Sequence, residues 1–230
     1  PMHAFDYKYL SGAKINVRRA SDGEKITTLD EKEFTLNSNN LVICDGEKPV
    51  ALAGIMGGLN SEIREDTASV VFEAAKFKRD SVRKTSRALG QRSDSSARFE
   101  KGVDAYTTML ALKRVLHLVS ELGCGKIAEG IIDKNVETLE PKVIETSFDK
   151  INGVLGIRVP EGETINILNR LDFKTSVDGN TLKVTVPLYR EDVEGFPDLA
   201  EEVIREYGYD HIECTLFENS SITDGGKTDE

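Results

Sequence analysis

A polar stretch at residues 133–141 divides this 230-residue sequence in two. It is acidic and has no apolar periodicity, so it predicts a connection and not an element of a hydrophobic core. We therefore expect a first domain over residues 1–135 and a second over 142–214. The remaining residues, 215–230, are rich in Ser, Gly and Asp, which indicates a linker or a disordered tail.

Composition excludes several classes of protein. Hydrophobic residues make up 39 % and charged residues 30 % of the chain, as in ordinary globular domains. No apolar run approaches the roughly 20 residues of a membrane helix, and the start lacks a signal-peptide pattern. There are three cysteines, far apart in the sequence: Cys44, Cys124 and Cys214. Their odd number and wide spacing argue against a disulfide framework or a paired-cysteine zinc site and favour the cytoplasm. The chain starts within a patterned segment, so we expect it to be part of a longer protein.

The pattern of apolar residues predicts an α+β fold. Strands are expected at residues 14–18, 41–45, 50–56, 69–75 and 126–132, with 50–56 buried on both faces. Helices are expected from Asp80 to Gly90 and from Asp104 to Gly123. The second part predicts helices at 148–155, 161–171 and 198–207 and a β-hairpin around Asp178-Gly179.

Charge is unevenly distributed. The net charge of −10 disfavours a general nucleic-acid binder. Residues 76–98 nevertheless contain eight basic and two acidic side chains, a local excess of +6. Such a run is either a solvated helix face or a patch for a phosphate backbone.

Three features of the first part are candidates for a functional site. The cluster Gly54-Ile55-Met56-Gly57-Gly58 indicates a tight turn, or close approach of the backbone to a ligand. Glu73 stands alone in an apolar strand, where alternation favours solvent and burial would indicate pairing or function. His3 lies between apolar residues. His117 and His211 are expected to be exposed or structural.

The second part contains an acidic cluster. Asp198, Glu201 and Glu202 share one helix face, and Asp192 lies six residues before Asp198. Oxygen ligands alone would suit Mg²⁺. The same residues resemble the start of a capped helix, and spacing alone favours capping over metal binding.

Together these segments resemble the beta subunit of bacterial-type phenylalanyl-tRNA synthetases. The motifs of its B3/B4 editing domain are PMHAFD at 1–6, LAGIMGG at 52–58, FEAA at 72–75 and RSDSSARFEKGVD at 92–104. VPLYRED at 186–192 and DLAEEVIREYGYD at 198–210 match its B5 domain. The resemblance spans residues 1–215 and implies a mixed-sheet editing domain, lacking its N-terminal part, and a small winged-helix-like B5 domain.

The resemblance also implies an activity. A phenylalanine pocket rejects tyrosine by only about a hundredfold, so a second site must hydrolyse Tyr-tRNA(Phe). The family acts as a tetramer of two alpha and two beta subunits, binds tRNA(Phe) and uses ATP, which this part of the chain is not expected to bind. No membrane or DNA partner is implied. The ester is expected to be hydrolysed by a positioned water and not by a covalent nucleophile.

Site residues follow residue by residue from the same resemblance. Glu73 matches the residue that hydrogen-bonds the tyrosine hydroxyl, and His3 matches one near the ester. The remaining matches line the pocket or bind Mg²⁺ at the alpha subunit: Ala53, Gly54, Ser93 and Ser95 for the pocket, and Asp192, Asp198, Glu201 and Glu202 for Mg²⁺. Ser93 and Ser95 replace the family's Thr and Ala. We expect Gly54 and Glu73 to line one pocket with His3 at its edge, and Gly54→Trp to fill that pocket.

Two other functions are compatible with the residues. One is a nucleic-acid-binding module without catalysis, and the other is an assembly module whose carboxylates dock a partner subunit. The acidic second part disfavours DNA. The order and spacing of His3, Gly54, Glu73 and Ser93 favour the editing hydrolase.

Overall fold

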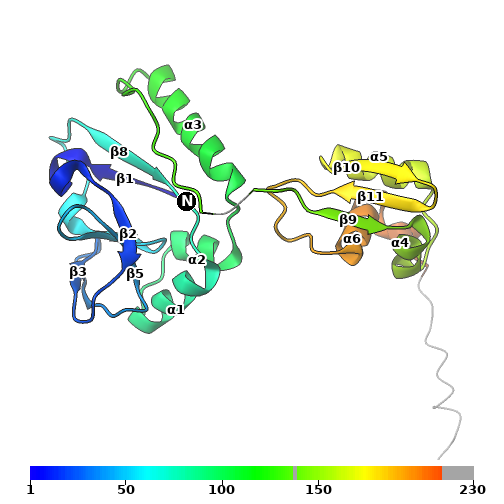
Figure 1. Cartoon of the computed structure of the whole chain (residues 1–230), viewed down its shortest axis with the longest axis horizontal. Coiled ribbons are helices and arrows are strands. Elements are labelled where there is room, and N and C mark those ends of the chain that lie inside the picture. The colour runs from blue at the N-terminus through cyan, green and yellow to red at the C-terminus, as the bar shows by residue number, and fades with distance from the viewer. Residues whose placement is uncertain (137–138, 214–230) are drawn as a thin grey trace, which may run out of the picture. The chain divides into compact units, whose positions relative to one another are not determined.

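The computed structural model describes residues 1–136 and 139–213, and contacts divide the chain into units of residues 1–139 and 140–230. The fold is α+β, as the sequence predicts, with helices packed on small antiparallel sheets in each unit (Figure 1). In the described part of the chain, no helix combines the length and the apolar character needed to cross a membrane. The predicted tail, 215–230, lies outside the described residues.

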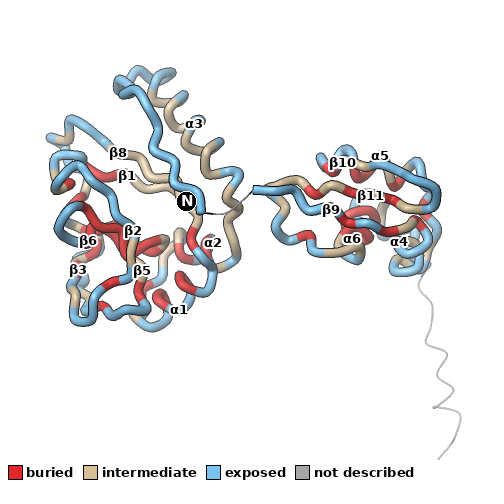
Figure 2. Tube along the Cα trace, in the orientation of Figure 1, coloured by how far each residue is buried: buried red, intermediate tan, exposed pale blue. Residues whose placement is uncertain are grey.

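The first unit is built on a four-stranded antiparallel sheet in the order β2-β5-β6-β7, a β3-β4 pair, and a separate β1-β8 pair. Their bounds are β1 Met2–Asp6, β2 Asn16–Arg19, β3 Lys25–Thr27, β4 Glu33–Thr35, β5 Leu41–Cys44, β6 Pro49–Leu52, β7 Met56–Gly57 and β8 Val70–Ala74. Both central strands, β5 and β6, are buried almost throughout (Figure 2). The expected buried strand at 50–56 is shorter in the structure, because a turn at Gly54, with φ of +72°, separates β6 from β7.

Three helices complete this unit: α1 Arg79–Leu89, α2 Asp94–Lys101 and α3 Tyr106–Glu121. Helix α1 begins one residue before Asp80, with Lys78 as N-cap, and ends at Gly90 as predicted. Helix α2 was not predicted from sequence. Helix α3 has no buried residue, although its apolar spacing indicated a packed face. The closing strand expected at 126–132 is wrong: that segment is exposed and has no strand pairing.

In the second unit, a three-stranded sheet in the order β10-β11-β9 packs with three helices. The elements are β9 Val143–Thr146, α4 Phe148–Leu155, α5 Glu161–Arg170, β10 Lys174–Asp178, β11 Thr181–Thr185 and α6 Phe196–Tyr207. The predicted helices and hairpin are confirmed, and β9 adds a strand that was not expected. Leu199 and Val203 of α6 are fully buried in its core.

Candidate functional site

The antiparallel pair β1-β8 places His3 directly opposite Glu73. Side chains opposite each other in such a pair share one face, with Cβ atoms roughly 5 Å apart. Phe5 lies on the same face, is 1 % exposed, and contacts the His3 ring edge-to-face at a centroid distance of 4.6 Å. The face that holds His3 and Glu73 is therefore the inner face of the strand pair, and the solvent-facing orientation favoured for Glu73 by alternation is wrong.

Burial changes the protonation of both side chains. It raises the pKa of Glu73 to about 7, because a half-buried carboxylate loses hydration. Burial also lowers the pKa of His3, since an imidazolium is disfavoured for the same reason. At neutral pH the pair therefore combines a neutral imidazole with a carboxyl group near its titration midpoint. Perturbed groups of this kind are typical of functional sites.

Gly57 lies against His3. A Cβ at this glycine would lie against Cε1 of His3 and only 2.6 Å from Nε2. Only glycine leaves room for the ring here. Sequence reasoning placed the important glycine at Gly54, although the cluster that indicated a close approach contained Gly57 as well.

Gly54 has a different role. Its φ of +72° favours glycine, and a Cβ there would lie 2.9 Å from the Phe77 ring, 3.1 Å from the Phe99 ring and 3.1 Å from a methyl group of Val82. The side-chain direction at Gly54 thus points into the core. A tryptophan at this position would disrupt packing as well as any pocket, so Gly54→Trp is a poor probe of the site.

Ser93 and Ser95 tie helix α2 to the turn at Gly54. The Ser93 hydroxyl donates to the Ile55 carbonyl at 2.6 Å, and the Ser95 hydroxyl donates to the Gly54 carbonyl at 3.1 Å. Ser93 is also the N-cap of α2 and accepts from the Ser96 amide. The two serines thus hold the turn in place, with Ala53 buried beside it.

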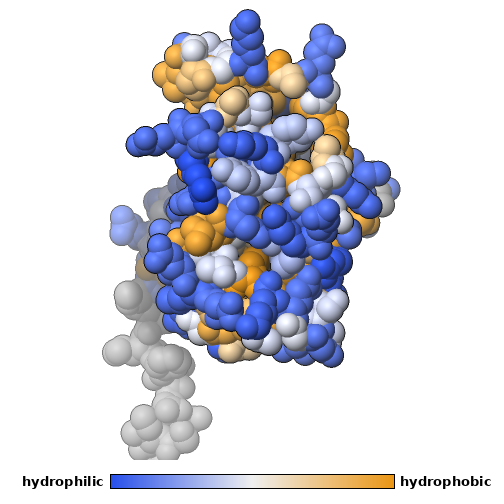
Figure 3. Space-filling view, turned by 90° about the vertical axis from the view of Figure 1, so that its left-hand side faces the viewer, coloured by the Kyte–Doolittle hydropathy of each residue, from blue (hydrophilic) through white to orange (hydrophobic). Residues whose placement is uncertain are grey.

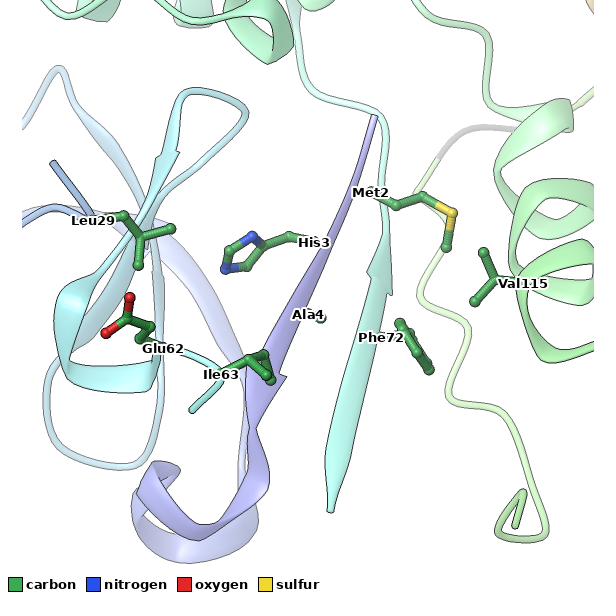
Figure 4. A pocket seen from close by; sticks show the side chains of 8 residues that line it. All are labelled: Met2, His3, Ala4, Leu29, Glu62, Ile63, Phe72 and Val115. Atoms are coloured by element: carbon green, nitrogen blue, oxygen red, sulfur yellow. The ribbon is translucent and has the colours of Figure 1, made fainter. Parts of the chain in front are cut away.

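A cavity of about 400 Å³ adjoins His3. In Figure 4 the imidazole points from β1 toward Leu29 and Glu62, while Met2, Phe72 and Val115 lie on the other side of the strand pair. Sequence reasoning did not identify Leu29 or Glu62, which no motif distinguished. Neither Gly54 nor Glu73 lines this cavity. The residues predicted for the editing pocket therefore do not all line one cavity, and the site assignment stays a prediction.

The acidic cluster of the second unit is held by arginines. Arg190 makes paired hydrogen bonds to Asp192 at 2.8 and 2.7 Å and to Glu202 at 3.1 and 2.8 Å. Glu202 is 3 % exposed and also pairs with Arg205. Asp192 and Glu202 therefore each have an arginine counter-charge, which spacing along the helix face alone did not predict. Arg190 lowers the pKa of Asp192.

The other two carboxylates of the cluster act separately. Asp198 is the third residue of α6, and its carboxylate accepts from the amides of Glu194 and of the N-cap Gly195, both at 2.8 Å. Glu201 is exposed. The described residues contain no group of three or more acidic, His or Cys side chains that could hold a metal. In this arrangement the residues do not fit Mg²⁺, which would have to displace Arg190, and the metal site stays a prediction.

Replacing Arg190 tests whether arginine or Mg²⁺ balances the charge of these carboxylates. Arg190→Ala leaves buried Glu202 with only Arg205, so we expect unfolding in urea to require about 3 kcal/mol less free energy. Arg205 is itself half exposed, and its loss leaves Glu202 paired with Arg190, so Arg205→Ala should cost less, about 1 kcal/mol. Millimolar Mg²⁺ should raise the melting temperature of Arg190→Ala and not that of the wild type. An equal Mg²⁺ effect on both would contradict the arginine-held arrangement.

A second experiment concerns the two glycines. In Gly57→Ala the new methyl group should expel the His3 ring toward solvent, so its pKa rises toward the ordinary value. Gly54→Ala should instead destabilise the fold, by about 2 kcal/mol, and leave the His3 pKa low. NMR titration of the imidazole resonances measures this, with exposed His117 and His211 as internal references. An unchanged His3 pKa in Gly57→Ala would show that Gly57 does not confine the ring.

Comparison with known proteins identifies both units. Residues 1–124 match the family model "B3/4 domain", and residues 144–209 match "tRNA synthetase B5 domain". The phenylalanine–tRNA ligase beta subunits of Bacillus licheniformis and Clostridium acetobutylicum are 45 % and 43 % identical over 225 residues, 98 % of this chain. This chain spans 28 % of the length of each of them.

Among solved structures, an N-terminal fragment of the phenylalanyl-tRNA synthetase beta subunit from Pyrococcus horikoshii aligns with 90 % of this chain and 60 % of its own. The identity is 18 % and the TM-score 0.46, so the family assignment depends on the sequence matches. The B3/4 match alone covers more than half of the 230 residues. The chain belongs to the family of phenylalanyl-tRNA synthetase beta subunits, of which it comprises a B3/4 domain followed by a B5 domain.

Proposed function

We propose that the first unit is an editing site that hydrolyses the ester of Tyr-tRNA(Phe). The observation that supports this most is the register of β1 and β8, which sets His3 opposite Glu73 on the inner face. The longer protein is proposed to charge tRNA(Phe) together with an alpha subunit, as two alpha and two beta chains. The names of the relatives are consistent with a ligase.

Glu73 would select the wrong amino acid. A phenol hydroxyl can donate to its carboxylate, whereas phenylalanine would leave that half-buried group without a partner. Because the pKa of Glu73 is about 7, its charge is partly suppressed in the free site. A hydroxyl that donates a hydrogen bond stabilises the ionised form, so tyrosine binding should lower this pKa.

His3 would orient the hydrolytic water. The lowered pKa keeps the imidazole neutral at pH 7, so one ring nitrogen can accept a hydrogen bond from water. Gly57 lies against the ring, and His3 lines the cavity of about 400 Å³. The arrangement requires no covalent intermediate. Deacylation should be slower below the His3 pKa, where the protonated ring can no longer accept.

The contribution of Glu73 can be measured as discrimination. In the full-length protein, Glu73→Ala should reduce the ratio of Tyr-tRNA(Phe) to Phe-tRNA(Phe) deacylation roughly tenfold or more, because a hydrogen bond to a charged group is lost. Glu65→Gln removes an exposed carboxylate from the same unit and should leave the ratio unchanged. The proposal fails if Glu73→Ala discriminates as well as the wild type.

A nucleic-acid-binding module without catalysis is the alternative, and the basic run at 76–98 favours it. The same assay separates the two. A wild-type protein that binds tRNA and deacylates neither ester would establish the alternative.

A further inference from the structure

The basic run of the first unit is gathered on the outer surface of α1 and α2. Helix α1 buries Ser81, Val82, Thr85 and Ser86, and α2 buries Ser96 and Phe99. The exposed side chains of the two helices are therefore mostly cationic: Arg79, Arg83, Lys84, Arg87, Arg98 and Lys101. Since the chain as a whole has a net charge of −10, this surface is a local exception. In the view of Figure 3, hydrophilic side chains are interspersed with smaller hydrophobic patches.

This surface leads into a second cavity, of about 470 Å³. Arg98 and Lys101 line it from α2, and Thr107 and Thr108 line it from the start of α3. Neither cation forms an ion pair among the described residues. The guanidinium of Arg79 lies against Gly102, which is also in the wall. Arg98 and Lys101 thus place two positive charges in the wall of the cavity, and Arg79 lies beside the wall.

The cavity contains one carboxylate, which is already engaged. Asp104 accepts from the amide of Thr107 at 2.7 Å and from its hydroxyl, so it serves as a cap for α3. Its charge reduces the local excess but does not cancel it. The remaining positive charge of the cavity suits an anionic ligand with several oxygen acceptors, and a phosphodiester is the simplest such group.

The cavity is next to the His3–Glu73 pair. Pro1 and Ala75, two positions from His3 and Glu73 along the two strands, line it at the end of the β1-β8 pair. Met2 and Ala74 line it as well, from the face of the pair opposite to His3 and Glu73. Helix α2 joins the two places, because Ser93 and Ser95 at its start bind the turn beside the site and Arg98 and Lys101 lie near its end. A ligand bound along α2 would thus have one end within reach of the pair.

We propose that Arg98 and Lys101, with the exposed cations of α1, bind the phosphate backbone at the 3′ end of the RNA whose ester the site hydrolyses. This inference rests on the proposed function. The amino acid would lie over the face of the strand pair that holds Glu73 and His3, and the adjoining phosphodiesters would lie in the second cavity. Backbone contacts of this kind position an RNA without reading its sequence.

The test uses the full-length protein and an RNA minihelix that ends in a 3′ single strand, so that remote contacts do not contribute. We expect Arg98→Gln/Lys101→Gln to weaken binding on the order of tenfold and to reduce the salt slope of log Kd by roughly 0.7 per lost contact. The control is Lys113→Gln/Arg114→Gln, which removes the same charge from exposed positions of α3. It should change neither quantity.

Two outcomes would overturn the inference. Equal weakening by the test and control pairs would mean that only net charge matters, and an unchanged slope in the test pair would mean that its cations do not touch phosphate. Melting temperatures within the error of the wild type exclude unfolding as the cause. Deacylation by the wild-type protein is measured in parallel. If the wild type deacylates Tyr-tRNA(Phe) and the Arg98→Gln/Lys101→Gln variant binds RNA normally, the inference fails and the editing function stands.

Discussion

The antiparallel pairing of β1 with β8 is the constraint on which the candidate site depends. The two strands are separated by more than sixty residues of sequence, and their register alone decides that His3 faces Glu73. A slip of one residue would turn both side chains to the opposite face. Phe5 fixes the register, because it must be buried and lies two residues from His3 on the same face.

The turn between β6 and β7 is the second part of the arrangement. Gly54 gives the turn its positive φ and packs into the core, and Gly57 allows the backbone to approach His3. The hydroxyls of Ser93 and Ser95 then attach α2 to the carbonyls of the turn. The position of α2, and with it of Arg98 and Lys101, therefore depends on the same few residues as the position of the imidazole.

Much of the fold could be predicted from the sequence. Helices α4, α5 and α6 have clear apolar spacing and glycine or turn residues at their ends, so their existence and type were predictable. Helix α2 was missed because it is short, polar and capped by a serine within a serine-rich segment. The strand expected at 126–132 failed since its apolar residues have no partner strand to bury them.

Predictions about side chains failed for a different reason. Alternation placed Glu73 toward solvent because sequence contains no information on which face of a lone strand pair is covered. The role of Gly57 depended on where His3 lies, more than fifty residues away. Arg190 was overlooked because helix-face spacing compares carboxylates with one another, whereas the residue that holds Asp192 and Glu202 lies outside the helix.

The most direct test of the site is to measure the pKa of the Glu73 carboxyl group by ¹³C NMR titration. A value about 7, as burial opposite His3 requires, would support the account. It should fall when a phenol such as tyrosine amide binds and stay constant with phenylalanine amide. A value near 4.5 in the free protein would mean that Glu73 is hydrated and does not belong to a selective site.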